Sequence, residues 1–215
     1  PVSQAQNWWS SSDDDKALLG VESNRISKDK AELLNYDNKY GVLIDRIVEN
    51  SGAEDGGLLP FDYIVAIDDE AMDWTTDLTD LLSKYDPGDE ATIHYYRKGK
   101  KSQTKVNFSA PRSSSFSGNM FKKSLFQSED PFLGVSTSRY YDADEIGVAV
   151  NIVDGATADQ MGLKDGDVIT SINGYTMIDW GDISRMMDHM LDVDDDITIE
   201  YTREGTNYTK SDVIK

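Results

Sequence analysis

The sequence predicts a mainly β protein with short helices, an α+β fold made of two partly open β-sandwich or barrel domains in tandem. The first observation is an internal repeat, because six short blocks recur in the same order in both halves of the 215-residue chain. The second is apolar alternation typical of short strands within each copy. The third is a Ser/Gly-rich segment between the copies. Two long copies suit paired small domains better than a solenoid of shorter repeats.

The repeat and the intervening segment place the domain boundaries. Residues 1–16 are polar and of low complexity, and we expect a flexible lead-in. The first domain is predicted over residues 17–108, the linker over 109–130 and the second domain over 131–215. The paired blocks begin at Leu18 and Phe132, Gly41 and Gly147, Ala53 and Ala158, Asp62 and Asp167, Asp73 and Asp179, and Ala91 and Ile197.

Each copy is predicted to run strand, strand, short helix, strand, helix, strand, strand. Residues 41–48 and 147–153 alternate as strands, and residues 167–172 form a strand that ends at the turn signal Asn173-Gly174. Asp77 and Asp182 are predicted to cap the longer helix of each copy. Two final strands turn at Lys98-Gly99 in the first copy and at Glu204-Gly205 in the second.

Composition and charge exclude several partners. The formal net charge is -19, from 40 acidic and 21 basic residues, and such a field repels nucleic acid. The acidity indicates either a solvated surface or, as the sharper alternative, a basic ligand. No apolar run reaches the roughly 18 residues that a membrane span needs. Ser3-Gln4-Ala5 is typical of the end of a signal peptide and predicts an exported protein (periplasmic, cell-surface or secreted), unless the likeness is incidental.

Residues suited to catalysis or metal binding lack a recognisable pattern. The chain has no cysteine, and His94 and His189 have no carboxylate at ligand spacing. No nucleophile elbow or Ser/His/Asp context is present. The aspartates of residues 192–196 lack the glycine and glutamate of a calcium loop. We therefore expect no enzyme activity, no cofactor and no metal.

The motifs of the second copy carry a family resemblance. Phe132-Leu133-Gly134-Val135, Gly166-Asp167-Val168-Ile169 and Ile172-Asn173-Gly174, in this order, resemble PDZ domains of the bacterial type, found beside HtrA-type and carboxy-terminal processing proteases. The first copy is similar but has Phe61-Asp62 in place of Gly-Asp and Asp68-Asp69 in place of Asn-Gly. It also separates Gly20 from Gly41 by 21 positions, against 13 between Gly134 and Gly147.

The resemblance implies a peptide-binding groove in each copy. A ligand's C-terminal segment would add as a strand beside the strand that follows the Φ-Leu-Gly-Φ loop, which suits the unpaired groups of an edge strand. The glycine lets backbone amides gather at one carboxylate. These amides are those of Leu19, Gly20 and Val21 in the first copy and of Leu133, Gly134 and Val135 in the second.

An apolar helix stripe would form the other wall of each groove. Leu78, Leu82 and Tyr85 share one face in the first copy, and Ile183, Met187 and Met190 have the same spacing in the second. Leu82 and Tyr85, or Met187 and Met190, would line the pocket for the last ligand residue. Leu81 and Met186 lie off the stripe and are expected in the core. The alternative is that the stripes themselves are closed core.

The extra residues of the first copy contain a predicted helix. Ser27 is a plausible N-cap before Lys28-Asp29-Lys30-Ala31-Glu32 within residues 25–40. We expect this helix beside the first groove, partly shading it.

These features predict a non-catalytic protein that captures C-terminal or extended peptide segments by β-strand addition. Two alternatives remain open. The chain could be the regulatory part of a larger exported protease, or a structural surface protein with degenerate grooves.

Overall fold

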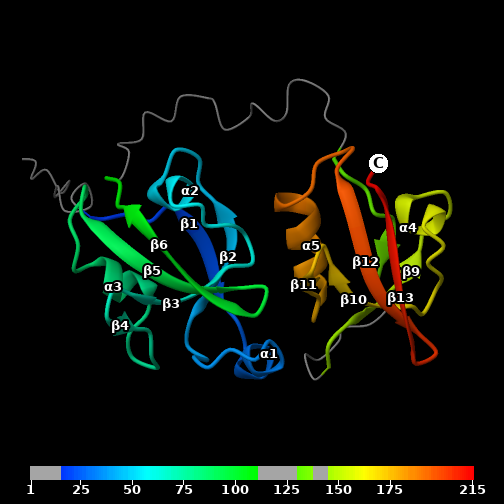
Figure 1. Cartoon of the computed structure of the whole chain (residues 1–215), viewed down its shortest axis with the longest axis horizontal. Coiled ribbons are helices and arrows are strands. Elements are labelled where there is room, and N and C mark those ends of the chain that lie inside the picture. The colour runs from blue at the N-terminus through cyan, green and yellow to red at the C-terminus, as the bar shows by residue number, and fades with distance from the viewer. Residues whose placement is uncertain (1–15, 111–129, 138–144) are drawn as a thin grey trace, which may run out of the picture.

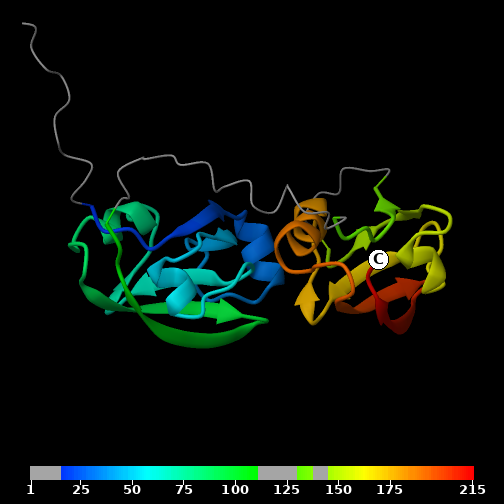
Figure 2. The ribbon, with the colours of Figure 1, turned by 90° about the horizontal axis from the view of Figure 1, so that it is seen from above.

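The computed structural model describes residues 16–110, 130–137 and 145–215. The flexible lead-in predicted for residues 1–16 and the linker predicted for residues 109–130 lie almost wholly outside these described residues. Figure 1 shows two similar β-rich bodies side by side, with helix α5 of the second body facing the first. Figure 2 shows the same arrangement from above.

The first body is built on one antiparallel sheet. Its strand order is β1-β2-β3-β5-β6, with β4 paired to β3, so β1 lies at an edge. Its elements are β1 (Val21–Arg25), α1 (Lys28–Leu33), β2 (Val42–Ile47), α2 (Gly52–Asp55), β3 (Tyr63–Ile67), β4 (Glu70–Ala71), α3 (Leu78–Leu82), β5 (Glu90–Arg97) and β6 (Lys100–Asn107).

The second body repeats this plan with a divided sheet. One sheet has the order β11-β10-β12-β13, with β8 on β10, and β7 pairs with β9 alone. The predicted strand over residues 147–153 is therefore two short strands. Its elements are β7 (Val135–Ser136), β8 (Val148–Ala149), β9 (Asn151–Ile152), α4 (Thr157–Gln160), β10 (Val168–Ile172), β11 (Tyr175–Thr176), α5 (Trp180–His189), β12 (Asp196–Arg203) and β13 (Thr206–Val213).

This architecture confirms the predicted fold class, mainly β with short helices and two similar domains in tandem. The boundaries at 17–108 and 131–215 remain a prediction. Alternate side chains of β5 and β12 are buried, as expected for strands with one face on a core. The two cores are separate, with one exception: Phe61 of the first body packs in the core cluster of the second.

A buried ion pair recurs at the same place in both copies. Arg97 Nε donates to Asp62 Oδ1, and Arg203 Nε donates to Asp167 Oδ1, both at 2.7 Å. The same guanidinium groups donate through Nη2 to the carbonyls of Gly57 and Gly162. Each pair joins the end of β5 or β12 to the loop before β3 or β10. The aspartate carboxylates are buried, and a buried charge needs a partner of opposite charge.

Two helix predictions need correction in their details. Asp77 caps α3 as predicted, but α5 begins at Trp180 with Asp179 as its N-cap. Asp182 instead occupies the third helical position, where its carboxylate completes a capping box. Helix α3 ends at Leu82, so Tyr85 lies beyond it.

The helix predicted in the extra residues is confirmed, but its predicted place is wrong. Ser27 Oγ accepts from Lys30 N at 3.0 Å and caps α1. Helix α1 lies against the second body rather than beside α3, in both views (Figures 1 and 2). The physical reason is that Lys30 finds two carboxylates there, Asp179 and Asp182.

Candidate functional site

The loop before β1 combines an edge strand with unused backbone donors. Among the strands that the structure describes, β1 pairs only with β2 and leaves its other edge without a strand. The carbonyls of Leu19 and Gly20 accept from Ala53 N and Val48 N, each at 2.9 Å. Within the described residues, the amides of Leu19 and Gly20 themselves have no acceptor. Two consecutive free donors at the head of an edge strand suit a carboxylate.

The loop before β7 has the same arrangement. The carbonyls of Leu133 and Gly134 accept from Ala158 N and Val153 N, both at 2.9 Å. The amides of Leu133 and Gly134 have no acceptor in the part of the chain that the structure describes. The Leu19 and Leu133 side chains are buried and anchor each loop to its core. The two copies therefore present equivalent donor pairs.

Both loops require glycine. Gly20 and Gly134 have φ values of 84° and 75°, which L side chains rarely adopt. A Cβ on Gly20 would overlap the Cβ of Ser51, and one on Gly134 would overlap the Cβ of Ala156. The close approach of the segment that follows β2 or β9 also brings the amides of Ala53 and Ala158 to the carbonyls of Leu19 and Leu133.

Half-buried apolar side chains line the rim of each core at equivalent positions. Four pack against the first core and four against the second, and they match pairwise between the copies. They are Val21, Ile47, Leu82 and Tyr85 in the first domain and Val135, Ile152, Met187 and Met190 in the second. Six of these eight are the site residues expected from the sequence.

The other stripe residues lie deeper. Leu78 is 8% exposed and Ile183 is 2% exposed, so each lies largely within its core. Leu81 and Met186 are each 1% exposed, in the core as expected. Ile47 and Ile152 were missed by the sequence reasoning, although the register places them opposite Val21 and Val135. Strand alternation could have found them only with the pairing register known.

Tyr85 and Asp68 form a polar contact in the first domain that Met190, the equivalent of Tyr85, cannot make in the second. Tyr85 Oη donates to Asp68 Oδ2 at 2.8 Å, and its ring lies 5.0 Å from the ring of Phe108. Burial, followed by the neighbouring Asp68, raises the pKa of Tyr85 to about 12. The N–H of Thr92 and then the Tyr85 hydroxyl hold the pKa of Asp68 below its usual range. The equivalent residue of the second domain is the flexible Met190.

Among residues 16–110, 130–137 and 145–215, no group of three or more His, Asp or Glu side chains is placed to hold a metal ion. Within the same ranges, none of the helices has the length and apolar character for crossing a membrane.

Comparison with known proteins identifies relatives of both copies. Residues 17–108 and 131–211 each match the family model described as PDZ domain. A probable periplasmic serine protease do/HhoA-like of Haemophilus influenzae is 26% identical over 175 residues, which cover 80% of this chain and 36% of that protein. A probable periplasmic serine endoprotease DegP-like of Pseudomonas putida is 30% identical over 169 residues, covering 75% of this chain and 35% of that protein.

The similarity to these proteases is confined to their PDZ part. The chain spans about a third of the length of these curated relatives. Among solved structures, the HtrA-type protease AlgW with decapeptide is 28% identical, covers 45% of this chain and 30% of that one, and has a TM-score of 0.39. The described residues contain no protease domain. The relatives are named as periplasmic, which supports the exported location predicted from the sequence.

Proposed function

Because this chain belongs to the PDZ domain family, we propose that it binds C-terminal or extended peptide segments of other proteins in two grooves, without catalysis of its own. A ligand strand would pair with the free edge of β1 or β7. Its carboxylate would be received by the amides of Leu19 and Gly20, or of Leu133 and Gly134. Its last apolar side chain would lie against Leu82 and Tyr85, or against Met187 and Met190.

One observation carries this proposal: each edge strand begins with two consecutive amides that have no acceptor among the described residues. A protein that folded these loops only for stability would pair those donors, because a buried or crowded N–H without a partner is costly. The half-buried rim residues beside the donors supply the apolar contact that an extended peptide needs.

The second groove is proposed to prefer peptides ending Φ-x-Φ-COOH. Ile183 opens its stripe and has no polar atom, so a ligand hydroxyl held against it would lose a hydrogen bond at a cost of about 1–3 kcal/mol. Met187 and Met190 adapt to several shapes and discriminate weakly among Leu, Ile, Val and Phe. The first groove, with Tyr85 tied to Asp68, offers a stiffer pocket.

A second candidate function has its own support. The chain spans about a third of relatives named as serine proteases, so it could be the regulatory PDZ part of a larger exported protease. In that case the same grooves would recognise substrates or signals for a catalytic domain. The length of the native reading frame decides between the two.

A C-terminal peptide library screened against the 215-residue chain tests the proposal. We expect binders that end in apolar residues, and we expect amidation of the terminus to weaken binding because it removes the charge that the loop amides receive. If amidation has no effect, the grooves capture internal strands instead. If no peptide binds, the grooves are degenerate and the other alternative, a structural surface protein, is favoured.

A further inference from the structure

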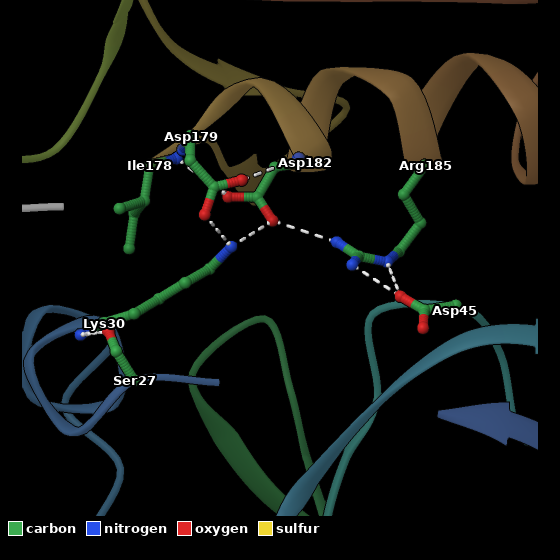
Figure 3. Close-up of polar contacts among 7 residues, drawn as sticks. All are labelled: Ser27, Lys30, Asp45, Ile178, Asp179, Asp182 and Arg185. Atoms are coloured by element: carbon green, nitrogen blue, oxygen red, sulfur yellow. Dashed lines mark hydrogen bonds and ion pairs between the residues drawn. The ribbon is translucent and has the colours of Figure 1, made fainter. Parts of the chain in front are cut away.

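Helix α5 is joined to the first domain by a chain of ionic contacts (Figure 3). Lys30 Nζ donates to Asp179 Oδ2 at 2.8 Å and to Asp182 Oδ1 at 2.6 Å. Arg185 Nη1 donates to the same oxygen of Asp182 at 2.9 Å. Arg185 Nε and Nη2 donate to Asp45 Oδ1, on β2, at 2.8 and 2.5 Å. Lys30 and Asp45 belong to the first domain and the other three residues to the second.

Apart from Asp179, whose side chain is 37% exposed, this network is largely shielded from water. The side chains of Lys30 and Asp182 are 7% and 2% exposed, and those of Arg185 and Asp45 are 12% and 21% exposed. Salt screens such pairs little, and loss of one partner leaves an uncompensated charge. The contacts therefore hold a defined geometry, unlike exposed surface ion pairs.

The carboxylates that contact Lys30 also define the start of α5. Asp182 Oδ2 accepts from Ile178 N at 2.9 Å, and Asp179 Oδ1 accepts from Asp182 N at 3.2 Å. Each carboxylate thus uses one oxygen for the helix and the other for Lys30. Lys30 of the first domain therefore contacts the two residues that set where α5 begins.

Helix α5 carries the proposed wall of the second groove. Met187 packs against the second core two residues after Arg185, and Met190 is the C-cap of the helix. Because packed helices move as units, a displacement of Arg185 or Asp182 moves Met187 with it. Helix α3, the counterpart in the first domain, has 5 residues against the 10 of α5.

The first copy departs from the second where it contacts the second domain. Phe61 stands at the position of Gly166, and its ring lies 4.9 Å from that of Tyr175. Lys98 stands at the position of Glu204, donates to the carbonyl of Asn173 at 2.8 Å and lies over the Tyr175 ring. Helix α1, the extra segment, supplies Lys30. These differences build an interface that a repeat of the second copy would lack.

We propose that the first domain is a positioning element for the second groove, with Lys30, Asp45 and Arg185 holding α5 at the place that peptide binding requires. Asp45 also accepts from Asn24 on β1, so the network ends on the edge strand of the first groove. This inference rests on the proposed peptide binding by the second groove.

Methyl NMR of the full chain with labelled methionine tests the proposal at the groove itself. Of the seven methionines, Met187 and Met190 line the second groove, while Met161 and Met177 report on its core. The probe is a short peptide that ends in Val-Ala-Leu with a free carboxylate. We expect Asp45→Asn and Lys30→Met to weaken binding, read from Met187 and Met190, by about fivefold or more.

A matched control and a double variant separate this effect from general damage. Glu90→Gln removes an exposed ion pair of the first domain, with Lys105, away from the interface and should leave the affinity unchanged. Asp45→Asn combined with Arg185→Gln should cost less than the sum of the two separate losses, because both changes remove the contact between Asp45 and Arg185. If a network variant loses the Met161 and Met177 signals of the folded core, it has unfolded and does not test the proposal. Lys98→Met then takes its place, because it breaks a different contact of the same interface.

The outcomes for this inference and for the proposed function are distinct. If the wild-type Met187 and Met190 signals do not respond to the peptide, the proposed binding by the second groove is wrong. If they respond with the same affinity in the wild type and in every folded interface variant, the second groove is independent of the first domain and the inference is overturned.

Discussion

The ring of Phe61 packs against the ring of Tyr175 across the two domains, with centroids 4.9 Å apart and planes 39° from parallel. Phe61 holds a φ of 71°, and Gly166 at the equivalent position of the second domain has 86°. A bulky side chain at positive φ is strained by about 1–2 kcal/mol. The strain persists because the ring is buried between Tyr175 and the guanidinium of Arg185, 5.1 Å away.

Phe61→Gly should loosen the two domains. The change relieves the backbone strain but removes the ring from the interface, so we expect more interdomain motion at little cost to the fold of the first domain. Small-angle scattering and NMR relaxation of the full chain measure this motion. Phe61→Asn, which tolerates positive φ but has no ring, should behave like the glycine variant. An unchanged scattering profile in both variants would show that the ring does not hold the domains together.

Gly134→Ala should destabilise the second domain and weaken its peptide binding. The positive φ costs about 1–2 kcal/mol, and the overlap with the Ala156 Cβ adds about 1–3 kcal/mol. Gly162→Ala is the matched control, because Gly162 has a φ of 85° but open space around it. Denaturant unfolding compares the two. Adding Ala156→Gly to Gly134→Ala should restore the part of the unfolding free energy that the overlap removes. Equal losses of unfolding free energy in Gly134→Ala and Gly162→Ala would show that the overlap has no effect.

Met187→Lys should abolish peptide binding in the second groove while the domain stays folded. Met187 is half-buried at the rim of the core, so a lysine stem can follow the same path and place its charge in the pocket. We expect at least about a tenfold loss of affinity, equivalent to about 1.4 kcal/mol. Asp188→Lys, at an exposed position of the same helix, controls for the added charge. Wild-type affinity in a folded Met187→Lys variant would remove Met187 from the site.

Acid should weaken the first domain partly through Asp68. Its pKa is held below the usual aspartate value of about 3.9 by the N–H of Thr92 and the hydroxyl of Tyr85. A carboxylate with a lowered folded pKa contributes stability above its unfolded pKa and loses it as the pH falls through the folded value. As the pH falls below about 4, Asp68→Asn should therefore lose less unfolding free energy than the wild type.

Tyr85→Phe provides the intermediate case for the acid prediction. It removes one donor to Asp68 and leaves the Thr92 N–H bond, so its acid sensitivity should fall between those of the wild type and Asp68→Asn. Urea unfolding as a function of pH supplies the comparison. Identical pH profiles for all three proteins would show that Asp68 has no part in acid sensitivity.

Local sequence rules determined much of this protein. The repeat and strand alternation predicted the fold class, and the Ser27 and Asp77 caps fell where short-range donor and acceptor spacing places them. The Leu-Gly motif, through the family resemblance, located the two loops whose Leu and Gly amides have no acceptor among the described residues, and the positive φ of each glycine is a local requirement. Leu81 and Met186 were assigned to the core by helical spacing alone. In each of these cases the deciding neighbours lie within a few residues in the chain.

Only the tertiary structure decided where the long-range partners lie. Lys30 and Asp179 are 149 positions apart, so no local pattern indicates that α1 packs on the second domain rather than beside the first groove. In the sequence, Phe61 is only a departure from the Gly-Asp motif. Its contact with Tyr175 is seen only in the folded structure. Ile47 and Ile152 join the apolar rims of the two cores through strand register. Local propensity depends on near neighbours, whereas interface contacts and register depend on how whole elements pack, and this packing is set by the burial of distant side chains.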